Sequence, residues 1–210
     1  KGFPGVLVET LAIFINNLSR PSNTRVASIT HGKFMIQSQK YIFDDKLPYW
    51  IIYRDNEFDS VCKKLDFNVF KVFRDRQITN KLLSPSGDIR VLKSRNISDD
   101  GQNVININGY DSYISDDDAK SLSVYSYLDC DNVYLTPNMT YKPRMIEKPK
   151  ECLVNGSLAV LIPKKGIIPT KEQLAFFSTQ EYRNFYQIAR NFQTRSLNVD
   201  ACSVFFYGLL

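Results

Sequence analysis

The stretch FFSTQEYRNFYQIARNFQTRSLNVD, residues 176–200, decides how the C-terminal part of the chain folds. Aromatic and small apolar residues recur in it at spacings of three and four, at Tyr182, Phe185, Tyr186, Ala189 and Phe192. This spacing places them on one buried stripe of a helix. Ser178 and Glu181 have the form of a capping box, in which a hydroxyl and a carboxylate satisfy two free amides of the first turn. The sequence therefore predicts an amphipathic helix over residues 179–191.

A shorter helix is predicted just before it. Thr170 and Gln173 repeat the capping-box pattern directly after Pro169, and this pattern is typical of a helix start. The shorter helix is expected to run through Phe177. The two helices would form a helical pair near the C-terminus.

Strand patterns dominate the preceding sequence. Short runs rich in β-branched and aromatic residues, bounded by polar turns, occur at 68–73, 88–94, 103–108, 123–128, 132–135, 152–162 and 203–208. Residues 58–65 have helical spacing instead. The predicted fold class is α+β: a β-rich domain over residues 57–210 that carries the C-terminal helical pair.

The N-terminal part has a different character. The apolar run 6–15 and the run 24–29 predict two strands around a loop that contains Asn, Ser and Pro. Two strands cannot bury themselves alone, so we expect residues 1–32 to be the last β-hairpin of a larger domain. Residues 33–56 show no clear period and are expected to connect the two units.

Composition narrows the class of protein. The 210 residues are 43% hydrophobic and carry 27 Lys and Arg against 22 Asp and Glu, so a folded chain is expected and a polyanionic partner is permitted but not required. The four cysteines are far apart and distant from the single histidine, His31, which predicts neither a zinc site nor a Cys–His nucleophile. The apolar runs are too short for a membrane span and no secretory signal is recognisable, so we expect a soluble cytoplasmic protein.

Four polar clusters carry the side chains that would define a function. Arg and Lys can neutralise phosphates, while Arg forks suit guanine and Asn or Gln suits adenine, so the clusters fit a reader of duplex DNA. Each cluster alone is also explained as a solvated loop, but four in one small domain favour binding. The candidate DNA-contacting residues are Arg74, Arg76, Gln77, Thr79, Asn80, Lys81, Lys93, Arg95, Asn96, Asn138, Tyr141, Lys142, Arg144, Arg190, Gln193, Thr194, Arg195, Ser196 and Asn198. In the last cluster the turn 192–198, rather than the helix before it, is the expected reader.

Five segments in a consistent order carry a family resemblance: FNVFKVFRDRQITNK (67–81), GDIRVLKSRNI (87–97), YLTPNMTYKPR (134–144), CLVNGSLAVLIPKKG (152–166) and EYRNFYQIARNFQTRSLNVD (181–200). Together they resemble the target recognition domain of adenine-specific DNA methyltransferases from type IIS restriction-modification systems. The opening FPGVLVETLAIFIN (3–16) looks like the closing strand region of the methyltransferase domain. The resemblance implies sequence-specific binding of double-stranded DNA, S-adenosylmethionine as methyl donor, and an adenine flipped into a separate catalytic domain.

The chain also departs from the family pattern. The catalytic N-P-P-Y type motif has no counterpart, since Leu47-Pro48-Tyr49 lacks the polar residue and the second proline. The glycine-rich F-x-G-x-G type loop for the cofactor is missing as well. We therefore expect the chain to bind DNA beside its own N-terminal catalytic methyltransferase domain, with no catalytic, cofactor-binding or metal-binding residue of its own. S-adenosylmethionine is expected only for the parent enzyme.

Two other functions stay open on the sequence. Asp44-Asp45-Lys46 has the D-x-K form of metal-dependent nucleases, and residues 116–118 supply a second acidic run. Alternatively the chain is a protein-interaction module whose partner packs against Tyr110, Tyr113, Tyr125 and Tyr127. The placement of the polar clusters discriminates between these functions, because convergence on one face favours DNA binding and scatter contradicts it.

Overall fold

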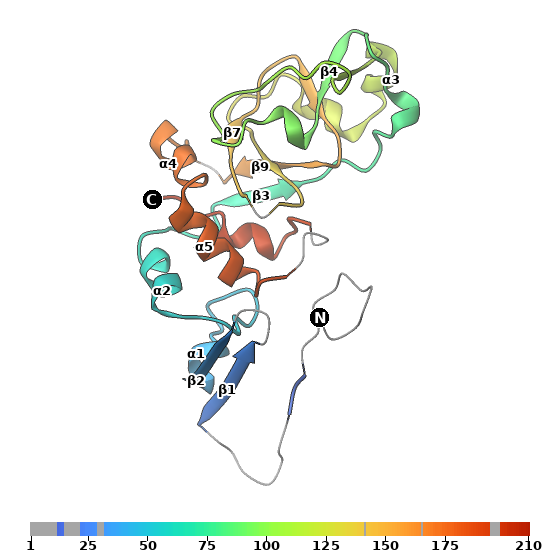
Figure 1. Ribbon diagram of the computed structural model, residues 1–210. Coiled ribbons are helices and arrows are strands. Elements are labelled where there is room, and N and C mark those ends of the chain that lie inside the picture. Colours follow the sequence, from blue (N-terminus) through green and yellow to red (C-terminus); the bar gives the residue numbers. More distant parts are fainter. Residues whose placement is uncertain (1–11, 15–21, 29–31, 141, 165, 194–197) are drawn as a thin grey trace.

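The structure is a computed structural model that describes residues 12–14, 22–28, 32–140, 142–164, 166–193 and 198–210. Within these ranges the chain is a mixed α+β protein with three separate sheets and a C-terminal helical pair (Figure 1). The α-helices are α1 (Gln39–Ile42), α2 (Asn56–Cys62), α3 (Asp116–Lys120), α4 (Lys171–Phe176) and α5 (Gln180–Ala189). Short 3-10 helices are η1 (Asn80–Leu82), η2 (Ser94–Asn96), η3 (Ser123–Tyr127) and η4 (Ser203–Phe206).

Two of the sheets form the main body. The four-stranded antiparallel sheet has the order β3 (Phe70–Phe73), β9 (Leu158–Pro163), β6 (Tyr134–Pro137) and β7 (Ile146–Glu147). The three-stranded sheet has the order β5 (Ser112–Ile114), β4 (Ile89–Leu92) and β8 (Cys152–Val154), with β4 and β8 parallel. The short turn 155–157 carries the chain from β8 in one sheet to β9 in the other.

Strand β9 separates two hydrophobic cores. Its residues 158–161 are buried on both faces of the strand, which explains why the sequence shows a continuous apolar run rather than an alternation. Because side chains alternate along a strand, Ala159 and Leu161 enter one core while Leu158 and Val160 enter the other.

The helical core lies on the side of β9 that carries Ala159 and Leu161. Helices α2 and α5 pack together there, with the rings of Phe58 and Phe185 stacked at a centroid distance of 4.9 Å. The other large side chains of this core include Phe70, Phe177, Tyr182, Phe206 and Tyr207. Removing a ring of this kind from a packed core costs about 3–5 kcal/mol in proteins generally. The aromatic stripe predicted for residues 179–191 is therefore a packing surface.

The sheet core lies on the other side and holds the three-stranded sheet in place. Val91, Ile114 and Leu153 are fully buried in it, together with Val124 from η3. The connections η1, η2 and α3 surround this core and carry much of the polar sequence. The polar loops are thus attached to a rigid base.

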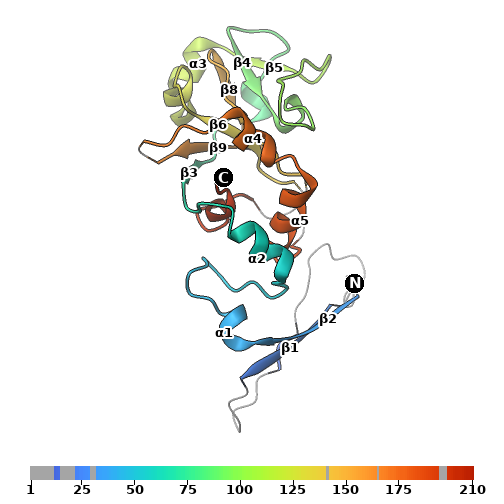
Figure 2. The same cartoon turned by 90° about the vertical axis from the view of Figure 1, so that its left-hand side faces the viewer.

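The third sheet is a hairpin of β1 (Asn23–Ser28) and β2 (Lys33–Ser38), which pair along their full length. It lies at the end of the molecule opposite the three-stranded sheet (Figure 2). The sequence predicted the strand at 24–29 but left 33–38 without structure. The predicted boundary at residue 32 consequently falls in the turn of one hairpin.

The predicted strand at 6–15 lies mostly outside the described residues. Its described part, 12–14, belongs to no strand, and Ile13 and Phe14 are exposed. The structure thus pairs β1 with β2, and it does not establish a hairpin of methyltransferase origin.

The helical pair is confirmed, with one correction at a cap. Thr170 and Gln173 form the predicted capping box at the start of α4. At α5 the predicted box of Ser178 and Glu181 is wrong, because Thr179 is the N-cap and its hydroxyl accepts from the amide of Tyr182 at 3.1 Å.

Three predicted strands are wrong. Residues 123–127 form η3, residues 203–206 form η4, and within 103–108 only Val104 makes an isolated bridge, to Ile97. Local side-chain bonds compete with the strand at η4, where the Asp200 carboxylate accepts from the amides of Cys202 and Ser203. Such bonds turn the chain even though the following residues have a high β-propensity.

Candidate nucleic-acid interface

The turn 155–157 is the point at which the predicted polar clusters meet. Its shape is set locally, since the Asn155 Oδ1 accepts from the Ser157 amide at 3.1 Å and from the Ser157 hydroxyl at 2.6 Å. Ser157 Oγ in turn accepts from the amide of Ser94 at 3.0 Å, and the carbonyl of Ser157 accepts from the amide of Asn138 at 2.9 Å. The clusters 93–96 and 138–144 therefore both bind to this turn.

The cluster 74–81 reaches the same turn through a close backbone approach. A Cβ atom on Gly156 would lie 2.8 Å from the carbonyl oxygen of Asp75, so only glycine allows the two loops to approach this closely. The buried Asp75 carboxylate accepts from the amides of Gln77 and Ile78, which bends the chain beside Gly156.

The fourth cluster joins through Asn138. The Asn138 Nδ2 donates to the carbonyl of Gly156 at 2.9 Å and to the Asn198 Oδ1 at 3.0 Å. The amide of Val199 donates to both oxygens of Asn138, and Arg190 donates to the carbonyl of Asn198 at 3.3 Å. One asparagine thus links the 155–157 turn to the end of cluster 190–198.

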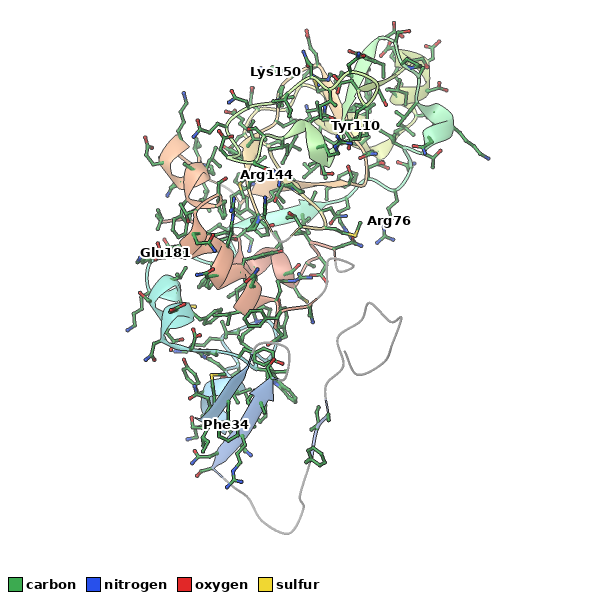
Figure 3. The ribbon with its side chains drawn as sticks, viewed as in Figure 1. Phe34, Arg76, Tyr110, Arg144, Lys150 and Glu181 are labelled. Carbon is green, nitrogen blue, oxygen red and sulfur yellow. The ribbon has the colours of Figure 1, made fainter. Side chains whose placement is uncertain are left out.

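Arg144 ties two clusters together from inside the molecule. Its guanidinium donates to the carbonyls of Lys142, Ser94 and Ile97 at 3.1–3.3 Å. Only 8% of Arg144 is exposed, and burial lowers the pKa of its guanidinium. Figure 3 shows Arg144 within the body, whereas Arg76 projects from its side.

Asn96, Asn138 and Arg144, which the sequence predicts to contact DNA, lie inside the protein. All three are buried, and Asn96 is fully enclosed, with its amide donating to the Ile105 carbonyl and to the Asp111 carboxylate. Buried backbone groups require hydrogen-bond partners, and these side chains supply them. They hold the loops in shape.

The remaining candidates differ in exposure. Gln77 is exposed, but its Oε1 already accepts from the Ser123 amide at 2.8 Å. Lys142 is exposed and forms a long ion pair with Asp99 at 3.7 Å. Seven candidates are exposed, namely Arg76, Gln77, Thr79, Asn80, Lys81, Arg95 and Lys142, and five are half-buried, namely Arg74, Lys93, Arg190, Gln193 and Asn198. Tyr141, Thr194, Arg195 and Ser196 lie outside the described residues, as does most of the predicted reading turn.

The structure adds residues that the sequence had not assigned to the site. A hollow of about 750 Å³ lies between loops 80–85 and 106–113. The predicted Asn80 lines it together with Asn106, Asn108 and Ser112. The sequence run NVININ was interpreted as a strand, although Asn108-Gly109 is a turn dipeptide that indicates a loop.

The acidic runs have structural roles. Asp44 pairs with Arg54 at 2.7 Å, and the Arg54 hydrogen bond holds the pKa of that carboxyl below its usual value. Residues 116–118 form the first turn of α3, where the helix dipole favours negative charge and Ser115 caps the helix. Among the described residues no group of three His, Cys, Asp or Glu side chains is placed to hold a metal ion.

The tyrosines of the protein-interaction alternative are all half-buried. Tyr127 packs against Phe73 at a centroid distance of 5.0 Å, and Tyr110 lies beneath the cations of Lys93 and Arg95. More exposed aromatics among the described residues include Phe14, Phe34 and Trp50, and Phe34 projects from the hairpin at the far end of the molecule (Figure 3).

Comparison with known proteins identifies no relative of this chain. No protein-family model matches the chain, and no curated protein is significantly similar to it. In the part of the chain that the structure describes, no helix is both long enough and apolar enough to cross a membrane. The convergence of the four clusters on the 155–157 turn is thus the observation on which a function can be argued.

Proposed function

We propose that this chain binds a specific sequence in double-stranded DNA, as the target recognition domain of an adenine-N6 methyltransferase of a restriction-modification system. The observation that carries the proposal is the convergence of four polar clusters, distant in sequence, on the 155–157 turn. In this proposal S-adenosylmethionine and the methyl transfer belong to a separate catalytic domain of the parent enzyme.

The proposed division of labour follows burial. The buried Asn96, Asn138 and Arg144 fix the backbone of the loops, so that the exposed side chains keep their positions when DNA is absent. Preorganised contacts bind more tightly because less conformational freedom is lost on association. Phosphate contacts would set the orientation of the duplex, and contacts with base edges would select the sequence.

The charges around the turn are compatible with a polyanion. Asp99 is one carboxylate of this surface, and its ion pair with Lys142 is long and has both partners well exposed. Exposed ion pairs of this kind contribute about 0–1 kcal/mol. Lys142 can therefore exchange Asp99 for a phosphate at little cost.

Binding is tested by fluorescence anisotropy after selection of duplexes from a random library at low salt. We expect the double substitution Arg76→Ala and Lys142→Ala to weaken binding of the selected duplex by about tenfold or more, since each cation removed costs on the order of 1 kcal/mol. Lys63→Ala with Lys171→Ala is the matched control, because it removes the same charge from exposed positions at the C-cap of α2 and in the first turn of α4. Absence of binding to any duplex, or an equal loss in the control, would contradict the proposal.

The methyltransferase part needs a separate measurement. With S-adenosylmethionine present, the parent enzyme is expected to methylate adenine N6 in the duplexes that this chain selects. Methylation that ignores the selected sequence would leave DNA binding in place and overturn the assignment as its recognition domain.

A further inference from the structure

We infer that Arg95 reads a guanine in the major groove and that Tyr110 is the positioning residue that aims it. The inference rests on the proposed function and deepens it, because it names one base of the recognised duplex and the pair of residues that selects it. Tyr110 belongs to none of the four polar clusters and is 15 positions from Arg95 in sequence.

The backbone beneath Arg95 is fixed on both sides. Its predecessor Ser94 donates to Ser157 Oγ at 3.0 Å, and its successor Asn96 is fully buried. The backbone N–H of Asn96 also donates to the Lys93 carbonyl at 2.8 Å, which closes the short helix η2. The side chain of Arg95 therefore leaves the surface from a defined point, and the residue is exposed.

Tyr110 is a braced platform for that side chain. Its amide donates to the Ile107 carbonyl at 3.0 Å, and its carbonyl accepts from the Lys93 ammonium. The next residue, Asp111, accepts from Asn96, from the Ile107 amide and from Arg90. A loop held at this many points keeps the ring in place, and Figure 3 shows Tyr110 on the same lobe as the three-stranded sheet.

The guanidinium of Arg95 lies over this ring, with its central carbon 4.7 Å from the centroid. A guanidinium that rests on an aromatic face still has its in-plane N–H donors free, and the planar fork matches the O6 and N7 acceptors of guanine. A flexible lysine binds phosphate equally well from many directions. A fork held in one plane is better suited to reading a base edge.

The positive charges of Lys93 and Arg95 favour a ligand with hydrogen-bond acceptor atoms beside the Tyr110 ring. The Lys93 ammonium lies 3.9 Å from the same ring centroid, and Arg90 is already paired with Asp111 at 3.0 Å. Among the described residues Arg95 has no hydrogen bond or ion pair with a side chain of opposite charge. Two cations thus share one ring, and a ligand with two acceptor atoms would relieve their repulsion.

The test uses the full chain and a selected duplex together with all its single-base-pair variants. Arg95→Lys is expected to weaken binding of the selected duplex about 10- to 100-fold and to abolish the preference at one G·C pair, because a lysine lacks the fork. Tyr110→Ala and Tyr110→Leu should lose the preference at that same pair. Tyr110→Phe keeps the aromatic ring, and its affinity for the selected duplex should stay within about threefold of that of the unsubstituted chain.

The outcomes separate this inference from the proposed function. If Arg95→Ala weakens every duplex alike and lowers the slope of log K against log salt concentration by about one, while Arg95→Lys binds like the unsubstituted chain, Arg95 binds phosphate and the inference is overturned, although the chain still binds DNA. If the Tyr110 variants lose preference at a different base pair from Arg95→Lys, Tyr110 does not position Arg95. If the unsubstituted chain binds no duplex, the proposed function itself fails. Thermal unfolding of each variant identifies a general loss of structure, and Tyr110→Leu replaces Tyr110→Ala if the latter unfolds.

Discussion

At the scale of the residue, the buried side chain of Asn138 connects separate loops by hydrogen bonds. Its side chain accepts from the Val199 amide and donates to Gly156 and Asn198, so one amide group satisfies three partners. Arg144 and Asn96 act in the same way on the neighbouring loop. Each replaces water as the partner of backbone groups that folding has buried.

Replacing Asn138 by Ala should lower the free energy of unfolding by about 2–3 kcal/mol, because buried partners are left without hydrogen bonds. Urea denaturation at pH 7 measures this loss. Asn106→Ala, at an exposed position of the hollow, should change the free energy of unfolding by about 0.5 kcal/mol or less. Equal effects of the two substitutions would mean that Asn138 does not link the loops.

The carboxyl group of Asp111 should make the stability of the fold depend on pH. Burial raises the pKa of its carboxyl, but hydrogen bonds from Asn96, from the Ile107 amide and from Arg90 outweigh burial and leave the pKa below its ordinary value of 3.8. A carboxyl with a lowered pKa in the folded state stabilises the fold above its ordinary pKa, and this stabilisation is lost as the pH falls through the folded-state pKa.

Asp111→Asn is therefore expected to lower stability at pH 7 by about 2 kcal/mol and to reduce the loss of stability between about pH 4 and pH 2. Urea midpoints at several pH values measure both effects. The exposed Asp45→Asn is the control. A parallel shift of the whole pH profile for Asp111→Asn would show that its charge is not involved.

At the scale of the element, caps and side-chain bonds decide where helices begin and where strands fail. Thr179 caps α5, while the hydroxyl of Ser178 is buried and has no hydrogen-bond partner among the described residues. The two residues are chemically alike and adjacent. Only the direction in which the chain enters the helix separates their roles.

The pair supplies a sharp test of helix capping. Thr179→Ala should lower the free energy of unfolding by about 1 kcal/mol, because an amide of the first turn loses its partner. Ser178→Ala should have almost no effect or increase stability slightly, since it removes a buried hydroxyl without a partner. Thermal or urea unfolding compares the two variants. A larger loss of stability for Ser178→Ala than for Thr179→Ala would support the capping box predicted from the sequence.

At the scale of the whole molecule, two cores flank β9 and the hairpin β1–β2 lies outside both. Of the described residues in β1 and β2, Val26 and Ser28 are buried, but neither belongs to a core. The segment around Ile51 is instead part of the helical core, and Asn191 binds the backbone of Trp50 and Ile52. The main body therefore begins before α2.

Removal of residues 1–37 is expected to leave one cooperative unfolding transition, with a Tm within about 4 °C of the intact chain, because neither core loses a side chain. DNA binding should be retained, since the four clusters and the 155–157 turn remain. Calorimetry and anisotropy measure the two properties. Loss of cooperative unfolding would show that the hairpin belongs to the body.

The local signals of the sequence predicted much of the fold. Helices α4 and α5, strands β3 and β4 and the α+β class followed from periodicity and composition, because these depend on residues close together in the chain. The single run expected as a strand at 152–162 is instead two strands, β8 and β9, which belong to different sheets. The strands expected at 123–128 and 203–208 were wrong, since hydroxyl and carboxylate groups turned the backbone there.

For the site, the order of amino acids establishes which residue types are available in the four clusters, and hence the chemistry that a partner would meet. Which of these residues face solvent follows from the fold alone. Asn138 and Arg95 belong to the same kind of polar cluster, yet one is buried by a contact 60 residues away and the other lies exposed on Tyr110. The physical reason is that burial and alignment are set by long-range contacts at the 155–157 turn, which no local pattern of residues records.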